Sequence, residues 1–240
     1  MIKLKKNFEY ILIFLLFCCL IFILSFNILH YDPIFGYDGE AHHEYVQNFL
    51  NLYPPWENDL LPEIYTYEFF SPPLPYVFPA FVNEVCKRYI TFENGDIYNN
   101  CRILYGFINM IFNSILFITL LMIYQKITNL LFKNNSYFNL TTILVMIIFT
   151  ANYKTIVMLR GEMYILLLNS LMLYQFIKIY KNNFKFGNKD LLKFGLIIGG
   201  LALSRQWAFL LFPAYFLLTI FIDNKEERLR YIKFISMAVK

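Results

Sequence analysis

The sequence predicts an all-α fold, a multi-pass transmembrane helix bundle of about six spans with a large first extracytoplasmic loop that carries interfacial amphipathic helices. Composition is the first observation, because 58% of the 240 residues are hydrophobic and only 16% are charged. The mean hydropathy of +0.48 also lies outside the usual range of soluble globular chains. The second observation is that long apolar segments alternate with short polar ones, several of them rich in lysine, as in cytoplasmic loops of membrane proteins.

The first apolar segment, residues 8–29, is expected to be a retained membrane anchor. Lys3, Lys5 and Lys6 precede it, which predicts a cytoplasmic N-terminus. The segment is too long for a secretory signal peptide, and no cleavage site of the Ala-x-Ala kind follows it. The chain is therefore predicted to be an integral membrane protein.

Residues 30–102 form the longest polar segment and are expected on the extracytoplasmic side, because their charged residues are mostly acidic. Asp38 is well placed to cap a helix from Gly39 to about Tyr53, since its carboxylate can accept a hydrogen bond from an unpaired backbone N–H. A second helix, Leu74 to Val85, would be opened by the prolyl pair before it. It is apolar enough to lie on or dip into the membrane face.

The start of the first of these helices is the candidate active site. His42 comes one helical turn after Asp38, so the two side chains share a face. A carboxylate here could take the proton of an attacking hydroxyl, which makes Asp38, Glu40 and His42 the candidate catalytic residues. The helix also has an apolar and a polar stripe, so an ordinary capped interfacial helix with a solvated face is an alternative interpretation.

Three further spans are expected at residues 103–125, 138–151 and 163–178. Asn109 and Asn113 are four residues apart in the first of them, so the face that they share should look into the bundle. The lysine-containing segments after the first and third of these spans are expected in the cytoplasm. Between the second and third, residues 152–162 are expected to form a short outer turn.

The last apolar stretch is interrupted near its middle by Ser204-Arg205-Gln206-Trp207. A single long span would place the basic residues after it outside, against the positive-inside rule, so two short spans at 191–203 and 208–222 are favoured. Each would be ~22 Å long, less than the ~30 Å hydrocarbon core, as in spans that lie inside a bundle or beside a cavity. Both chain ends are then cytoplasmic.

This topology places Lys154, Arg160, Glu162 and Arg205 on the same outer face as Asp38. Charges at membrane depth are costly and usually functional, and guanidinium groups bind phosphate through two hydrogen bonds at once. The four residues are therefore the candidate substrate- and phosphate-binding residues, with a lipid-linked sugar phosphate as the expected substrate. Interfacial anchoring of the two arginines by snorkelling is the alternative.

No cofactor is certain, and a divalent metal held by Asp38 and His42 is left open. The spacing matches no closed zinc pattern, and adjacent His42 and His43 should point to different faces. Cys86 and Cys101 share the extracytoplasmic loop, where oxidation is allowed, so a disulfide between them is expected. The chain has no glycine-rich phosphate loop and no basic, aromatic-laced patch, so nucleic acid is not an expected partner.

Four short motifs follow one another along the chain: Asp38…His42…Tyr45, Pro72-Pro73-Leu74-Pro75-Tyr76, Arg160-Gly161-Glu162, and Gly200-Leu201-Ala202-Leu203-Ser204-Arg205-Gln206-Trp207. Their order resembles that of the GT-C glycosyltransferases, closest to the protein O-mannosyltransferase and aminoarabinose-transferase-like group. The resemblance implies transfer of a sugar from a polyprenyl-phosphate donor to a lipid or protein acceptor on the outer face of a membrane. A bacterial cytoplasmic membrane is favoured over the endoplasmic reticulum. The resemblance also implies that Asp38 is catalytic and that the outer arginines bind the donor phosphate.

Two departures from the family pattern leave questions open. Many relatives have adjacent Asp-Glu, whereas here Gly39 separates Asp38 from Glu40, so either carboxylate could face the acceptor. Family members are also longer, so the chain is expected to be the N-terminal part of a longer enzyme. The alternative functions are a transporter or flippase of lipid-linked sugars and a non-catalytic membrane subunit.

Overall fold

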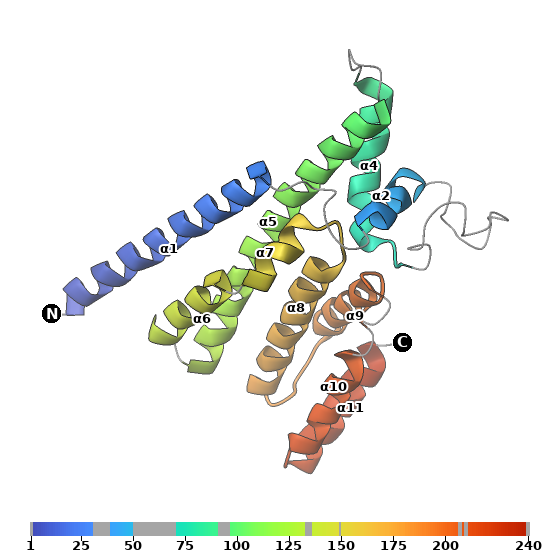
Figure 1. The fold of residues 1–240 in the computed structure, drawn as a ribbon. Helices are drawn as coiled ribbons and strands as arrows, with labels where there is room; N and C mark the ends of the chain where they lie inside the picture. The colour runs from blue at the N-terminus through green and yellow to red at the C-terminus, as the bar shows by residue number, and fades with distance from the viewer. Residues whose placement is uncertain are drawn as a thin grey trace. The chain divides into compact units, whose positions relative to one another are not determined.

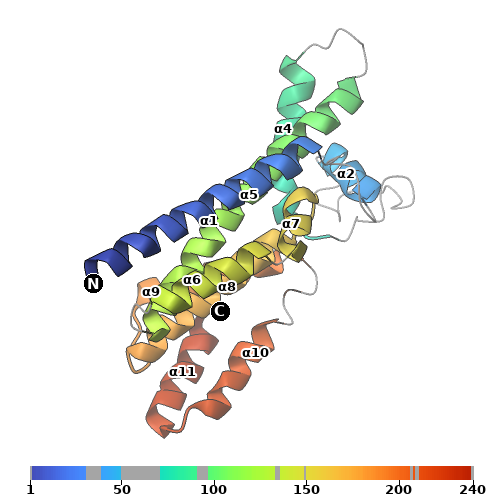
Figure 2. The same ribbon diagram turned by 60° about the vertical axis from the view of Figure 1, so that its left-hand side comes forward.

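The computed structural model of the chain is helical throughout the part that it describes, with no strand among those residues. The described residues are 2–30, 39–49, 71–90, 97–132, 136–148, 150–205, 208 and 211–238. They fall into two compact units, shown in Figures 1 and 2: unit 1 is Met1–Phe69 with Tyr76–Arg160, and unit 2 is Phe70–Pro75 with Gly161–Lys240. The predicted all-α class is confirmed for the described residues.

Unit 1 is organised around one long helix, α5 (Ile97–Phe132), drawn in green in Figure 1. Among the helices that pack against it are α1 (Ile2–His30), α6 (Ser136–Ile148) and α7 (Thr150–Val157). Within unit 1, α1 and α5 contain segments long and apolar enough to cross a membrane, Ile11–His30 and Asn100–Phe132. Their outward side chains are apolar too, as in helices that face lipid, since Phe22 is 71% and Ile115 55% exposed.

Two amides of α5 are buried, as their spacing predicted. Asn109 and Asn113 are 2% and 0% exposed. Nδ2 of Asn113 donates to the carbonyl oxygens of Ile156 and Met158, at 3.1 and 3.4 Å. Carbonyls at a helix C-terminus lack partners within the helix, so Asn113 supports the end of α7. The expected outer turn at 152–162 is thus helical in its first part, since α7 runs to Val157.

Residues 30–102 contribute α2 (Gly39–Gln47) and α4 (Leu74–Tyr89). α2 begins at the expected residue, and its apolar stripe is buried, with Tyr45 0% exposed, while Glu44 on the polar stripe is exposed. α4 also begins at the expected residue, directly after the two prolines, and runs past Val85. α2 ends at Gln47, before the expected end at about Tyr53. Asp38 and residues 50–53 lie outside the described residues.

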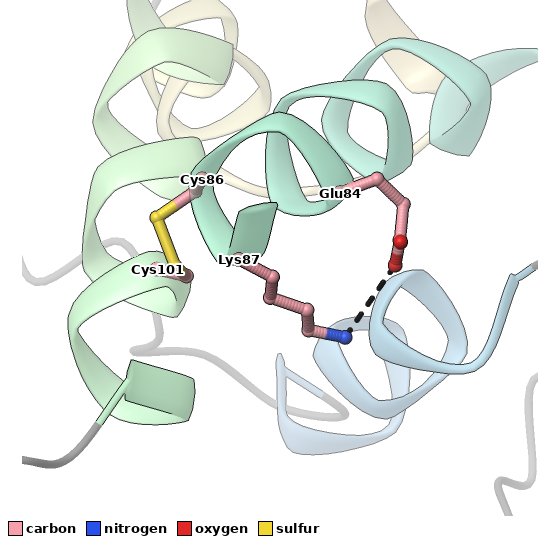
Figure 3. The surroundings of a disulfide bond; sticks show 4 residues. All are labelled: Glu84, Cys86, Lys87 and Cys101. Atoms are coloured by element: carbon pink, nitrogen blue, oxygen red, sulfur yellow. Dashed lines mark ion pairs between the residues drawn. A yellow bond between two sulfur atoms is a disulfide. The ribbon is translucent and has the colours of Figure 1, made fainter. Parts of the chain in front are cut away.

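A disulfide joins Cys86 of α4 to Cys101 of α5, as expected (Figure 3). The two helices run antiparallel, because Phe78, earlier in α4, packs on Phe112, later in α5, with ring centroids 4.6 Å apart. Figure 3 also shows Lys87 of α4 reaching over α2 beside Glu84. The lysine pairs with Glu84 at 3.5 Å, and its Nζ donates to the carbonyl oxygen of Gln47, also at 3.5 Å. The disulfide and the lysine thus tie α4 to α5 and to α2.

Unit 2 contains the remaining helices. They are α8 (Glu162–Lys181), α9 (Asn188–Ala202), α10 (Leu211–Leu217), the 3₁₀ turn η4 (Leu218–Phe221) and α11 (Lys225–Ala238). Aromatic rings from the last three α-helices and from the turn after α8 fill its core: Phe184, Phe194, Tyr215, Tyr231 and Phe234. The hydroxyl of Tyr231 donates to the carbonyl oxygen of Tyr215 at 2.7 Å, and burial raises the pKa of Tyr231 above its ordinary value.

Three of the six predicted spans are helices of spanning length among the described residues, the third being α8. The other three correspond to shorter helices: α6 with 13 residues, α9 with 15, and α10 with 7 followed by η4. At 1.5 Å per residue, the longest of these covers only ~22 Å. α9 ends at Ala202 and the chain is not helical at Leu203 to Arg205, so the last apolar stretch is broken where two short spans were predicted.

Candidate functional site

The first turn of α2 carries an ion pair with the start of α5. A carboxylate oxygen of Glu40 accepts a hydrogen bond from Nη2 of Arg102. The Glu40 side chain is 69% exposed and that of Arg102 only 18%, so the carboxylate reaches solvent while the guanidinium is mostly covered. A negative charge in the first turn is also stabilised by the helix dipole.

The two adjacent imidazoles of α2 are buried, and each contacts a different tyrosine. Nδ1 of His42 lies 2.7 Å from Oη of Tyr76 on α4, and Nδ1 of His43 lies 2.8 Å from Oη of Tyr105 on α5. All four residues are at most 1% exposed. Because successive helical side chains point about 100° apart, the histidines face different helices, as predicted, and fasten α2 to both.

This burial favours a positioning role for His42. Its ring also stacks on that of Tyr76, with centroids 5.8 Å apart, inside the contact between α2 and α4. A general acid or base must come within hydrogen-bond distance of the reacting atom, and a ring that is 1% exposed offers a substrate almost no surface. The role that the geometry supports is to hold α2 so that Glu40 faces solvent. The catalytic role of His42 stays a prediction.

Unit 2 holds a second polar cluster, built from three segments that are far apart in sequence. Nη2 of Arg205 lies 3.2 Å from Oε1 of Glu162, and its Nη1 lies 3.5 Å from Oγ of Ser71. The Arg205 and Glu162 side chains are 17% and 25% exposed, so the pair is largely covered. Oε2 of Glu162 is buried and has no hydrogen-bond partner in the described part of the chain. Because burying an incompletely satisfied charge is costly, stability alone does not explain the cluster.

Glycine is required at position 161 because the turn that carries Arg205 comes very close. A Cβ added to Gly161 would lie 2.3 Å from the carbonyl oxygen of Ser204 and 3.2 Å from Cγ of Arg205. The same turn accepts a backbone hydrogen bond, since the N–H of Leu74 donates to the carbonyl oxygen of Leu203 at 2.9 Å. Gly161 and Leu74 thus bring three of the four sequence motifs together within unit 2.

The other two expected phosphate-binding residues lie in unit 1. Lys154 is exposed in the last turn of α7. Arg160 is partly exposed in the segment after α7, where its backbone N–H donates to the carbonyl oxygen of Met158 at 3.0 Å. The structure therefore brings Glu162 and Arg205 into direct contact. That Lys154 and Arg160 share one face with them stays a prediction.

Among the described residues, no group of three or more His, Cys, Asp or Glu side chains is arranged to hold a metal ion. Asp38, the other expected ligand, lies outside them. Nδ1 of His42 is engaged with Tyr76, so a metal would have to bind this ring through Nε2. A metal held by Asp38 and His42 stays a prediction.

Sequence reasoning gave no role to the partners of the candidate residues, namely Arg102, Tyr76, Tyr105 and Ser71. Arg102 is one of few basic residues in a mostly acidic segment, and that rarity is a signal for pairing. The tyrosines had no such signal, because each lies 34 or 62 residues from the histidine that it contacts. Buried imidazoles need hydrogen-bond partners, but the burial itself is visible only in the folded chain.

Comparison of the chain with protein-family models, with curated proteins and with solved structures gave no match in any of the three.

Proposed function

We propose that the chain is a membrane glycosyltransferase, or the N-terminal part of one, that moves a sugar from a polyprenyl-phosphate donor to a lipid or protein acceptor on the extracytoplasmic face. The observation that carries this proposal is the cluster of Ser71, Glu162 and Arg205 in unit 2. Glu162 and Arg205 belong to two motifs of the GT-C order, and Ser71 directly precedes a third. A largely covered guanidinium beside a hydroxyl suits the binding of a phosphate ester.

In the proposed reaction, the acceptor hydroxyl attacks the anomeric carbon of the sugar. The bond from that carbon to the phosphate oxygen breaks, and polyprenyl phosphate leaves with the bonding electron pair. Asp38 takes the proton of the acceptor hydroxyl. Arg205, together with Arg160, stabilises the negative charge that grows on the departing phosphate. Glu162 orients Arg205, whose planar fork of N–H donors fits both a carboxylate and a phosphate.

The proposed topology has six spans, with α6, α9 and α10 as the short ones and both chain ends in the cytoplasm. Residues 30–102 are then extracytoplasmic. The disulfide between Cys86 and Cys101 supports this placement, because disulfides persist in oxidising compartments and are rare in the cytosol. We place the chain in a bacterial cytoplasmic membrane, whose outer face meets that condition.

The test uses the full chain reconstituted in liposomes with a panel of polyprenyl-phosphate sugars that carry a label in the sugar. We expect the label to move to an acceptor while free polyprenyl phosphate appears. Arg205→Ala should raise the KM for the donor and leave that for the acceptor unchanged. Arg160→Ala should likewise weaken donor binding more than acceptor binding, and Lys178→Ala, on the opposite side of the proposed bundle, should change neither.

The same experiment separates the alternative functions. A flippase would move the intact donor between leaflets without releasing polyprenyl phosphate. A non-catalytic subunit would do neither, whichever donor is offered. Equal effects of Arg205→Ala on the donor and acceptor KM would contradict the phosphate role of this arginine even if transfer is observed.

A further inference from the structure

One face of α4 is apolar and open. Val77, Phe81 and Val85 are 49%, 65% and 38% exposed, and their spacing of four residues puts them on one side of the helix. Together with Phe49, two residues after the end of α2, they line a groove of about 570 Å³. On the buried side of α4, by contrast, Asn83 is 0% exposed. The buried side also holds Tyr76 and Ala80, which are 1% and 4% exposed. An exposed apolar stripe is nevertheless unlike the polar outer face of a helix that meets water.

α4 also lies beside part of a candidate span. The apolar window of α5 begins at Asn100, and the disulfide to Cys86 lies at Cys101, next to that start. Phe78 packs on Phe112, which is twelve residues into the window, or ~18 Å at 1.5 Å per residue. The whole window of 33 residues is ~50 Å long, which exceeds the ~30 Å hydrocarbon core by ~20 Å. With the window centred on the core, ~10 Å of it lies outside at each end and Phe112 lies ~8 Å deep. Because half of the core is ~15 Å thick, the first turns of α4 lie next to the part of α5 that an outer leaflet would cover.

The charged residues of α4 all lie toward its C-terminal end. Its first ten residues, 74–83, carry none, whereas Glu84, Lys87 and Arg88 all lie in its last two turns. Arg88 is exposed, lies seven residues after Phe81 and therefore on the same side of the helix, and also lines the groove. Basic side chains at the shallow end of an apolar helix are placed to meet phosphate headgroups.

The deep end of α4 exposes few backbone donors. Pro72, Pro73 and Pro75 have no N–H, and the N–H of Leu74 donates to the carbonyl oxygen of Leu203. The first N–H groups of a helix normally lack partners, and such groups are costly in hydrocarbon, where no water can satisfy them. The start of this helix is therefore suited to the hydrocarbon part of a membrane.

We propose that α4 enters the outer leaflet beside α5, as one arm of a disulfide-linked hairpin, with its Val77–Phe81–Val85 face against lipid acyl chains. Arg88 then lies at the headgroups of anionic phospholipids. The proposal differs from a helix that lies flat on the membrane, because the N-terminal end of α4 is the deepest part. It does not depend on sugar transfer.

The test measures depth along α4 in the full chain, reconstituted in vesicles of phosphatidylethanolamine and phosphatidylglycerol. Cys18 and Cys19 are replaced by alanine, the Cys86–Cys101 disulfide is kept, and spin labels are attached in turn to Val77→Cys, Phe81→Cys, Val85→Cys and Arg88→Cys. Collision with oxygen, which concentrates in hydrocarbon, is compared with collision with a water-soluble nickel chelate. Ile115→Cys, exposed on α5, is the lipid control, and Glu44→Cys, exposed on α2, is the water control.

We expect the ratio of oxygen to nickel collisions at Val77 and Phe81 to match that at Ile115 and to exceed the ratio at Glu44 several-fold. The ratio should fall from Val77 through Val85 to Arg88. Equal ratios at Phe81 and Glu44 would mean that the face meets water. Shielding of Phe81 from both reagents would mean that protein covers it, and either result overturns the proposal. These side chains are exposed, so their replacement should not disturb folding. Retention of the Cys86–Cys101 disulfide reports whether a variant has folded, and a variant that has lost it is replaced by one labelled at a neighbouring position.

Discussion

Replacement of Gly161 by alanine tests the geometry of the Glu162–Arg205 cluster. The new Cβ would lie 2.3 Å from the carbonyl oxygen of Ser204, 3.1 Å from Cγ of Pro75 and 3.2 Å from Cγ of Arg205. The closest of these atoms is backbone, so it cannot move away by a change of rotamer. An ordinary contact is about 3.4 Å or more, so the 203–205 turn and the start of α8 must separate by about 1 Å.

Overpacking of this kind costs ~1–3 kcal/mol, so Gly161→Ala should lower the free energy of unfolding by that amount. The same displacement moves Arg205 relative to Glu162. If the cluster binds the donor phosphate, a misplacement of about 1 Å should reduce sugar transfer ~10²-fold beyond any loss of folded protein.

The assays are thermal unfolding in detergent and sugar transfer normalised to folded protein. Gly199→Ala is a matched control, since its added Cβ would meet nothing within 4 Å. Alanine in place of glycine inside a helix should leave stability unchanged or raise it by up to ~1 kcal/mol. If Gly161→Ala is as stable as the wild-type chain, the close approach to Ser204 is refuted.

Three further perturbations follow from the structure. Cys86→Ser should destabilise the chain by about 3 kcal/mol, as expected for a closed loop of about 15 residues; a thermal scan should show this, and Cys18→Ser, which removes a free exposed thiol, should not. Tyr76→Phe should cost ~1–3 kcal/mol by removing the buried hydrogen bond to His42, again by thermal scan, and no loss would contradict that bond. Because burial raises the pKa of Tyr231 in the folded state, the contribution of this group to stability is complete below about pH 10 and declines above it. Tyr231→Phe should therefore make stability less sensitive to alkaline pH in thermal scans at pH 8 and 10.5. An unchanged pH dependence would count against the buried hydroxyl.

Local signals in the sequence predicted much of the fold. The starts of α2 at Gly39 and of α4 at Leu74 were predicted correctly, because the sequence signals for a helix start lie within one turn of it. The expected cap, Asp38, lies outside the described residues. The spacing of Asn109 and Asn113 likewise predicted a buried polar face, since residues four apart stack on one side of a helix. The Cys86–Cys101 disulfide was expected because both cysteines lie in one loop that was predicted to face an oxidising compartment.

Features that depend on distant partners were not predictable in this way. Residues 152–157 of α7 were expected to belong to a short turn, but they are helical, and the amide of Asn113 on α5 donates to carbonyl oxygens at the C-terminal end of this helix. The expected span at 138–151 is divided between α6 and α7, and the one at 208–222 includes both α10 and the 3₁₀ turn η4, so neither forms one helix of spanning length among the described residues. In the candidate site, the carboxylates and imidazoles of α2 were visible in the sequence, whereas the Glu40–Arg102 and His42–Tyr76 pairs arise only when α4 and α5 pack on α2.

The glycosyltransferase proposal is tested most directly by sugar transfer from a labelled polyprenyl-phosphate donor with Asp38→Asn. This change removes the proton acceptor but keeps the size of the side chain and its ability to cap α2. We predict that transfer falls by ~10²–10⁴-fold, with membrane insertion unchanged, while Glu44→Gln, an exposed carboxylate on the same helix, transfers sugar at the wild-type rate. Transfer by Asp38→Asn at the wild-type rate would contradict the proposed chemistry at α2.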